Sequence, residues 1–210
     1  MWPPEALEFL RELEDNNDRG WFKANRARYD ELLLGPTREL TDKLAPLGPP
    51  HFFRPYTNTR FRPGPPLKEH IAASIGTGPA MYYFQLSLDG LVLGAGLWHP
   101  ETDQLERFRA AIDDGRAAAA FEAGVAKAEA AGLSLAEPEL KRAPKGYPQD
   151  HPRVDRLRLK RLALYHRHPL RRWLHTRSCD QRVQTQLEAA RPFVTWLNEH
   201  VGPSTRPRPR

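Results

Sequence analysis

Two arginines, a tyrosine and an asparagine stand at alternate positions in "RPYTNTRF", residues 54–61. Successive side chains of an extended strand point to opposite faces. Four side chains would therefore share one face: Arg54, Tyr56, Asn58 and Arg60. Guanidinium groups bind carboxylates and phosphates through paired hydrogen bonds, so the pattern predicts an anion-binding surface. The alternatives are a solvated edge strand and an internal network of ion pairs with acidic residues.

A second candidate surface comes from "MYYFQLSLDGLVLGAGLW", residues 81–98, which predicts a β-hairpin. Asp89-Gly90 is typical of a two-residue turn in which both positions have positive φ. With that turn, one face of the hairpin is apolar and should cover the core. The other face carries polar, aromatic and glycine positions, among them Tyr83, Gln85, Gly94, Gly96 and Trp98.

Glycines at positions 94 and 96 would leave part of that second face bare. Glycine within a strand often marks a place where another group approaches the backbone closely. The group is either a ligand or a helix packed on the sheet. The sequence contains no dinucleotide fingerprint, Walker loop or Gly-x-Ser-x-Gly elbow.

Further polar candidates lie in the loop "ELKRAPKGYPQDHP" and beside the first surface. Prolines and a glycine fix the backbone around Lys145 and Tyr147, and loops with fixed backbones often carry function. Pro-Lys-Gly is also an ordinary turn sequence, so ligand contact and a structural turn both remain open. Lys68 is a further cation expected to face the anion.

The candidates for acid–base catalysis are Asp150 and His151. Asp150 is alternatively placed to cap a helix that begins at Pro152. His166 and His168 would bind a metal only on a strand, and a surface position is expected for both. The single cysteine, Cys179, excludes an intramolecular disulfide and is expected to be a structural thiol. No metal and no cofactor is expected.

A basic stripe of Arg153, Arg156 and Lys160 is predicted on the helix after Pro152. Such a stripe is usually the solvated face of an amphipathic helix. It would also be the natural contact to phosphate backbones. The alternative function is therefore a nucleic-acid or protein interaction module that uses the basic helix at 153–161.

Composition limits these functions. The chain has 210 residues, of which 40% are hydrophobic and 28% charged, and its net charge is +6. Much of the positive charge lies in the final "RPRPR" and in residues 153–177. No apolar run is long enough for a membrane span and no signal peptide is visible. We expect a soluble cytoplasmic protein without membrane contact, and leave its oligomeric state open.

The elements around these residues predict an α+β fold. Helices are expected over the N-terminal third, with Asp18 as an N-cap and Gly35-Pro36 as a break. An antiparallel sheet is expected around the hairpin at about 80–98 and a strand at 51–61. Further helices are expected after "HPETD" with Leu105, Phe108 and Ile112, from about Arg116 to Ala131, and after Pro152. A final helix is expected with Val183, Leu187 and Leu197, and Pro192 should kink or divide it. We expect a single domain over 1–202 and a disordered basic tail over 203–210.

Four motifs together resemble a widespread uncharacterised family, the domain of unknown function 2461 family. "FLRELEDNNDRGWFKANRARYDELLLGP" is similar to its opening helices and "RPYTNTRF" to its Arg-x-Tyr-x-Asp-x-Arg-Phe strand. "GAGLWHP" with Arg109 and "LKRAPKGYPQDHP" are similar to its later motifs. The resemblance covers about residues 5–201. These residues match its pattern: Arg54, Tyr56, Arg60, Phe61, Lys68, Trp98, Pro144, Lys145, Gly146, Tyr147, Asp150, His151 and Pro152.

Two departures from that pattern matter. Asn58 stands where the family has Asp, so a carboxylate ligand or base is absent there, and Leu67 replaces a tyrosine. The resemblance implies no activity. The sequence therefore predicts a small anionic ligand, bearing phosphate or carboxylate, in a basic pocket, and it assigns no reaction.

Overall fold

The computed structural model describes residues 1–58 and 64–206. The chain forms two compact units, which are described one at a time. The first comprises Met1–Ile75, Tyr83–Leu93 and Arg167–Gln184. The second comprises Gly76–Tyr82, Gly94–His166 and Thr185–Arg210. The prediction of one domain over 1–202 stays a prediction.

The strands of the chain form a six-stranded antiparallel sheet, so the predicted α+β class is confirmed. The strand order is β1-β2-β3-β4-β6-β5. The strands are β1 (Pro50–Phe52), β2 (His70–Ile75), β3 (Met81–Ser87), β4 (Gly90–Leu97), β5 (Ser134–Leu135) and β6 (Leu162–His168). In the first unit, His51 of β1 lies opposite Ser74 of β2 in antiparallel register.

The turn of the predicted hairpin lies one residue earlier than expected. Strand β3 ends at Ser87, Leu88 and Asp89 form the turn, and β4 begins at Gly90. Gly90 has a φ of 127°, whereas no described residue other than glycine has a positive φ. Asp89 therefore does not adopt the backbone that an Asp-Gly turn of the predicted type requires. The apolar face is buried as predicted, for example at Phe84.

Six short helices build the N-terminal part of the first unit. They are α1 (Pro4–Asp15), α2 (Arg19–Ala24), α3 (Arg26–Tyr29), the π-helix η1 (Asp30–Leu34), α4 (Gly35–Lys43) and the 3-10 helix η2 (Ala45–Leu47). Asp18 caps α2 as predicted, because its carboxylate accepts from the backbone N–H groups of Gly20 and Trp21. The predicted boundary at Gly35-Pro36 coincides with the change from the π-helix η1 to α4, but the backbone stays helical through it. Helix α4 begins there, since proline is tolerated in a first helical turn.

Aromatic rings form the core beneath these helices. Phe22 lies 5.1 Å from Tyr29, and Phe9 lies 6.2 Å from Tyr29, measured between ring centroids. Burial raises the pKa of Tyr29 to about 12, so its phenol stays neutral. Trp2 donates its indole N–H to the hydroxyl of Thr37 at 3.0 Å, which satisfies a buried polar group.

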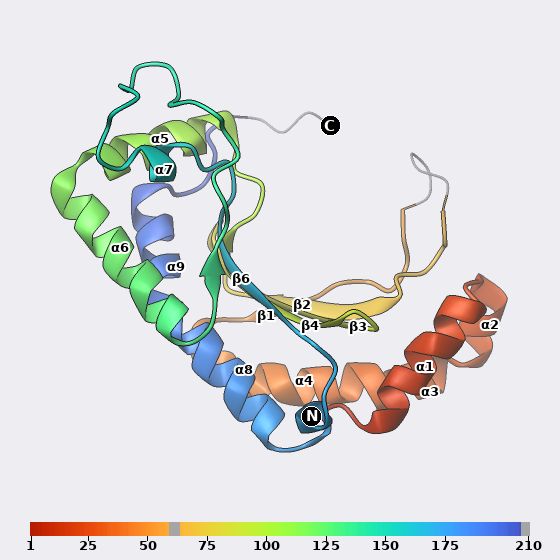
Figure 1. Ribbon diagram of the computed structural model, residues 1–210. Helices are drawn as coiled ribbons and strands as arrows, with labels where there is room; N and C mark the ends of the chain where they lie inside the picture. Colours follow the sequence, from red (N-terminus) through yellow and green to blue (C-terminus); the bar gives the residue numbers. More distant parts are fainter. Residues whose placement is uncertain (59–63, 207–210) are drawn as a thin grey trace. The chain divides into compact units, whose positions relative to one another are not determined.

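The second unit is built around helices α5 (Thr102–Asp113), α6 (Gly115–Ala130) and α9 (Arg191–His200), which pack on one another (Figure 1). Phe121 lies between Phe108, Phe193 and Trp196, at 5.0 to 5.5 Å between ring centroids. Gly124 permits this packing, because a Cβ there would lie 3.0 Å from the backbone nitrogen of Phe193.

Pro192 divides the last helix, as predicted. Helix α8 (Ser178–Ala189) ends before Ala190, and α9 begins at Arg191 with Pro192 in its first turn. The 3-10 helix η3 (Arg172–His175) precedes α8.

The helix expected after Pro152 is much shorter than predicted. Helix α7 comprises only Val154–Leu157, and Leu164 lies in strand β6. Leu164 is opposite Leu135 of β5, so its hydrogen-bonding partner is remote in sequence. His168 is buried rather than at the surface.

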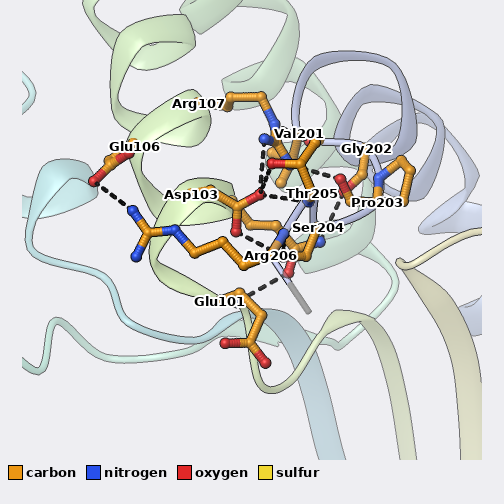
Figure 2. A network of polar contacts seen from close by, with 11 residues as sticks. Glu101, Asp103, Glu106, Arg107, Val201, Gly202, Pro203, Ser204, Thr205 and Arg206 are labelled. Carbon is orange, nitrogen blue, oxygen red and sulfur yellow. Dashed lines mark hydrogen bonds and ion pairs between the residues drawn. The ribbon is translucent and has the colours of Figure 1, made fainter. Parts of the chain in front are cut away.

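The C-terminal segment also differs from expectation. A disordered tail is predicted from residue 203, but Ser204 and Thr205 hydrogen-bond to Asp103 of α5 (Figure 2). Residues 207–210 lie outside the described part.

Candidate functional site

The predicted ligand-binding residues belong to both units, and each group is described within its own unit. The first unit contains Arg54, Tyr56, Asn58, Lys68, Tyr83 and Gln85. The second contains Gly94, Gly96, Trp98, Lys145 and Tyr147, together with Asp150 and His151. Arg60 and Phe61 lie outside the described residues.

The first group lies on a two-stranded ladder that is interrupted by a bulge. The backbone N–H of Phe53 donates to the carbonyl of Ala72 at 3.2 Å, and Tyr56 is bridged to Leu67. Between these two points, one segment of the ladder runs from residue 53 to residue 56, whereas the other runs from residue 67 to residue 72. The second segment is therefore two residues longer than the first. Lys68 itself is paired, because its backbone N–H donates to the Pro55 carbonyl at 2.7 Å, so the extra residues lie between Lys68 and Ala72. The regular strand β1 ends at Phe52, so the predicted strand over 51–61 is too long.

The described part of "RPYTNTRF" keeps its predicted alternation. Arg54, Tyr56 and Asn58 are exposed, whereas Pro55 and Thr57 are half-buried. Tyr56 is 46% exposed, and its ring meets the edge of Phe22 at 5.8 Å. The alternating segment therefore presents polar side chains outward while its other side is partly covered.

Several side chains gather around an exposed phenylalanine, Phe53. We define the Phe53 cluster as Phe53 and His51 together with three predicted site residues, Lys68, Tyr83 and Gln85. The Lys68 ammonium lies 5.6 Å from the centre of the Phe53 ring. The ring of Phe53 lies 6.0 Å from Tyr83 and 5.3 Å from His51, edge to face in both cases. Phe53 is 37% exposed, so the cluster reaches the surface.

A short hydrogen bond orders the polar edge of this cluster. The Tyr83 hydroxyl donates to Oε1 of Gln85 at 2.7 Å. Burial raises the pKa of Tyr83, so the phenol remains a donor at neutral pH. The arrangement leaves the Gln85 amide with its two N–H donors directed away from Tyr83.

Lys68 and Arg54 differ from the neighbouring arginines in their lack of acidic partners. Arg28 forms a paired contact with Glu12, at 2.7 and 2.8 Å, and Arg26 binds Asp30 at 3.0 Å. Within residues 1–58 and 64–206, no carboxylate lies within 4.0 Å of the side-chain nitrogens of Lys68 or Arg54.

Glu69, the carboxylate next to Lys68 in the chain, is engaged by a neutral side chain. Asn17 donates to its Oε1 at 2.7 Å and to the carbonyl of Leu67 at 3.1 Å, and accepts from the Leu67 N–H at 3.0 Å. Burial lowers the pKa of His70, and the nearby Lys68 lowers it further, so the imidazole is neutral at pH 7. In the described residues, Glu69 therefore bonds to Asn17 and forms no ion pair with Lys68.

The two glycines of the second group are surrounded by protein atoms. A Cβ on Gly96 would lie 2.2 Å from the carbonyl oxygen of Leu162 and 3.0 Å from the ring of Phe193. A Cβ on Gly94 would lie 3.3 Å from the ring of Trp98. Strand β6 and helix α9 thus explain the bare backbone at Gly96 through packing, which was the alternative to a ligand.

Trp98 packs against an aromatic ring and a guanidinium group of the same unit. Its ring is 5.5 Å from Tyr165, and the Arg161 guanidinium lies 5.3 Å from its centre. Arg161 was not singled out from the sequence, because its aromatic partner lies more than sixty residues earlier in the chain.

The loop that carries the acid–base candidates is attached to the C-terminal end of α5. His151 is near Asp113, with Nε2 and Oδ1 3.0 Å apart, and its Nδ1 accepts from the Arg153 N–H at 3.0 Å. Arg153 donates to the carbonyls of Ile112 and Asp113 at 2.6 and 2.8 Å. Both ring nitrogens of His151 are thus occupied by protein groups, and a catalytic role stays a prediction.

Asp150 does not cap α7. The N-cap residue of that helix is Arg153, without a side-chain cap, and Asp150 is exposed. Tyr147 packs edge-on against the His151 ring at 6.2 Å, whereas Lys145 is exposed. The capping interpretation of Asp150 is therefore wrong, because the helix begins at Val154 and not at Pro152.

The predicted basic stripe is largely used inside the protein. Arg156 forms a paired contact with Glu122 at 2.8 and 2.9 Å, and Arg153 is bound to α5 as described. Lys160 alone among the three stripe residues is exposed without a described ion pair. The guanidinium groups of Arg153 and Arg156 are consequently bound to protein acceptors, and of the stripe only Lys160 is left to contact a phosphate.

Three further features bear on the chemistry: the single thiol, groups that could hold a metal, and helices that could cross a membrane. Burial raises the pKa of the Cys179 thiol to about 12, as expected for a structural cysteine. No group of three or more His, Cys, Asp or Glu side chains suited to a metal occurs in residues 1–58 and 64–206. None of the helices described is long and apolar enough to cross a membrane.

Comparison with known proteins gives a family. Residues 5–196 match the family described as conserved hypothetical protein (DUF2461), and the chain belongs to that family. The resemblance seen in the sequence motifs is thereby confirmed. No curated protein and no solved structure matches the chain.

The packing around Gly96 yields a testable prediction. Gly96 has a φ of 124° and no room for a Cβ, so Gly96→Ala should destabilise the protein by about 2 kcal/mol or more. Gly115→Ala is the matched control, because no atom lies within 4 Å of its added Cβ. Urea denaturation measures both variants. Equal stability of Gly96→Ala and the wild type would contradict the packing explanation.

Proposed function

We propose that this protein binds an anionic ligand, carrying phosphate or carboxylate, at the Phe53 cluster and the neighbouring Arg54. The observation that carries the proposal is the Lys68 ammonium, which lies over an exposed aromatic ring without a described carboxylate partner. A half-buried ammonium of this kind attracts anions and donates up to three hydrogen bonds to them.

The other members of the cluster complement this charge. The Gln85 side chain supplies amide donors beside the Tyr83 hydroxyl that it binds, and His51 of β1 adds a second polar ring. Phe53 and Tyr83 provide an apolar surface beside these donors. The cluster thus suits a ligand that carries its anionic group next to a flat or apolar portion. The proposal assigns no reaction.

Arg54 adds charge to the same ladder. It lies between Phe53 and Pro55, and Pro55 accepts a 2.7 Å hydrogen bond from the backbone N–H of Lys68. Its guanidinium is exposed, and such a group binds phosphate or carboxylate in a bidentate manner. Arg54 therefore adds a second positive charge to the segment that carries the Phe53 cluster.

Nucleic-acid binding through residues 153–161 is the less favoured function. Arg153 and Arg156 donate their side-chain N–H groups to α5 and to Glu122. Contacts to a phosphate backbone would require these bonds to be broken, whereas Lys68 needs no such rearrangement.

The proposal predicts that Lys68→Gln weakens an anion-dependent thermal shift. Wild-type protein with pyrophosphate at constant ionic strength should melt a few degrees higher, since a ligand that binds only the folded state stabilises it. Lys68→Gln should need about fivefold more pyrophosphate for the same shift, because about 1 kcal/mol of binding is lost.

Lys160→Gln is the matched control, as Lys160 is exposed and has no described ion pair. It should keep the wild-type shift. A folded Lys68→Gln protein that responds to pyrophosphate as the wild type does would refute the proposed site.

A further inference from the structure

The second unit contains a cavity of about 670 Å³ that none of the predicted site residues lines. Its wall comes from the loop between β2 and β3, the end of β4, helices α5 and α9, and the C-terminal segment. The lining residues that matter here are Thr77, Gly78, His99, Asn198, Ser204 and Arg206. A volume of this size is typical of small-molecule sites.

One wall of the cavity is fixed by Asn198 of α9. Its amide accepts from the Ala80 N–H at 3.0 Å and donates to the Ala80 carbonyl at 3.1 Å. Gly78 makes this approach possible, because a Cβ there would lie 2.4 Å from Oδ1 of Asn198. The loop before β3 is thus held rigidly against α9 at the cavity.

The opposite wall is a segment that we call the C-terminal strap, residues 201–206. Figure 2 shows Asp103 of α5 at its centre, where the carboxylate accepts from Ser204 Oγ and from the Thr205 N–H, both at 2.8 Å. Arg107 donates to the carbonyls of Val201 and Pro203 and to Asp103.

A second contact continues the strap along α5. Gln104 donates to the Gly202 carbonyl at 2.7 Å and accepts from the Glu101 N–H at 2.9 Å. This capping box fixes the start of the helix as well as the strap. Hence the strap is an ordered wall, although its composition alone suggested a disordered tail.

The charged groups on the cavity wall are basic. Arg206 and His99 are the ionisable lining residues, and no aspartate or glutamate belongs to the described lining. The acidic contact of Arg206 is Glu106, at 3.9 Å, with both side chains more than half exposed. A pair of that kind contributes little in water, so the guanidinium is available to a competing anion.

We propose that this cavity is a second ligand site, which takes a small molecule bearing a carboxylate or phosphate group. Arg206 binds the anionic group, His99 and the Thr77 hydroxyl complete the polar contacts, and the strap forms one wall. The site is distinct from the Phe53 cluster, because it uses different residues of a different unit.

The strap itself gives a prediction on pH. Hydrogen bonds from Thr205, Ser204 and Arg107 hold the pKa of Asp103 well below its usual range, against the opposing effect of burial. A carboxylate whose pKa is lowered by folding stabilises the folded protein fully at pH values above its unfolded pKa of about 4. This stabilisation is lost as the pH falls from about 4 toward the folded pKa. The guanidinium of Arg107 is bound to the Asp103 carboxylate at 3.0 Å.

The Thr205 amide proton signal reports this contact by NMR. In the wild type it should keep its downfield position from pH 7 to about 4 and move only below that value. Asp103→Asn should move it at every pH, because the charged acceptor is lost. Asp150→Asn, at an exposed carboxylate without a described partner, is the control and should leave it in place. An unmoved signal in Asp103→Asn would contradict the strap contact.

The ligand site is tested on the ¹⁵N-labelled full chain at constant ionic strength. Citrate, inorganic phosphate and neutral glycerol are titrated separately, and the amide signals of Gly78, His99 and Ser204 are followed. We expect saturable shifts with citrate, with phosphate or with both, and none with glycerol. The more effective anion identifies carboxylate or phosphate as the preferred group.

Variants assign the effect to this cavity. Arg206→Gln should weaken the anion about fivefold or more, equivalent to about 1 kcal/mol. Arg142→Gln, at an exposed arginine of the same unit without a described partner, should leave the affinity unchanged, and so should Lys68→Gln. Absence of saturable shifts with both anions, equal shifts with glycerol, or an unchanged affinity in Arg206→Gln would overturn the proposal.

Discussion

The proposed function depends on one amide side chain, that of Asn17. It donates to Glu69 and to the Leu67 carbonyl, and it accepts from the Leu67 N–H. These bonds fix the ladder beside Lys68, whose backbone N–H donates to the Pro55 carbonyl. They also engage the nearest carboxylate in the chain with a neutral partner, so the charge of Lys68 is left for another anion. A lysine or arginine in place of Asn17 would satisfy Glu69 equally well, but it would add a charge; the amide leaves a single cation over Phe53.

The same physical device recurs in the second unit. Asn198 satisfies both backbone groups of Ala80, and Asp103 satisfies the N–H of Thr205. Buried or partly buried backbone groups need such partners, because an unpaired one costs about 1–3 kcal/mol. Irregular segments are thereby held as firmly as strands. Both proposed sites consist of irregular segments that side-chain hydrogen bonds hold in place. Each site has a cationic group, on Lys68 or Arg206, that takes no part in these hydrogen bonds.

Local sequence signals predicted the elements whose partners are close in the chain. The Asp18 cap bonds to groups two and three residues away, and Pro192 divides a helix through its own ring, so both could be read directly. Strand β6 was missed because Leu157 and Leu164 also fit one face of a helix. What makes residues 162–168 a strand is pairing with β4 and with residues 134–135, both remote in sequence, which periodicity does not reveal. The roles of Arg153 and Arg156 were hidden for the same reason, since their acceptors lie 34 to 41 residues away.

At the candidate site, Lys68, Tyr83 and Gln85 were predicted from their types. Phe53, around which they gather, was not, because nothing local distinguishes it from Phe52.

The central claim is that Lys68 binds anions because Asn17 keeps Glu69 away from it. The most direct measurement is the dissociation constant of pyrophosphate, by isothermal titration calorimetry at fixed ionic strength, in Asn17→Ala and in Asn17→Ala with Glu69→Gln. The account predicts that the single variant binds about tenfold more weakly, a loss of about 1.4 kcal/mol, and that the double variant recovers most of the affinity. Wild-type affinity in a folded Asn17→Ala protein, or no recovery in the double variant, would contradict it.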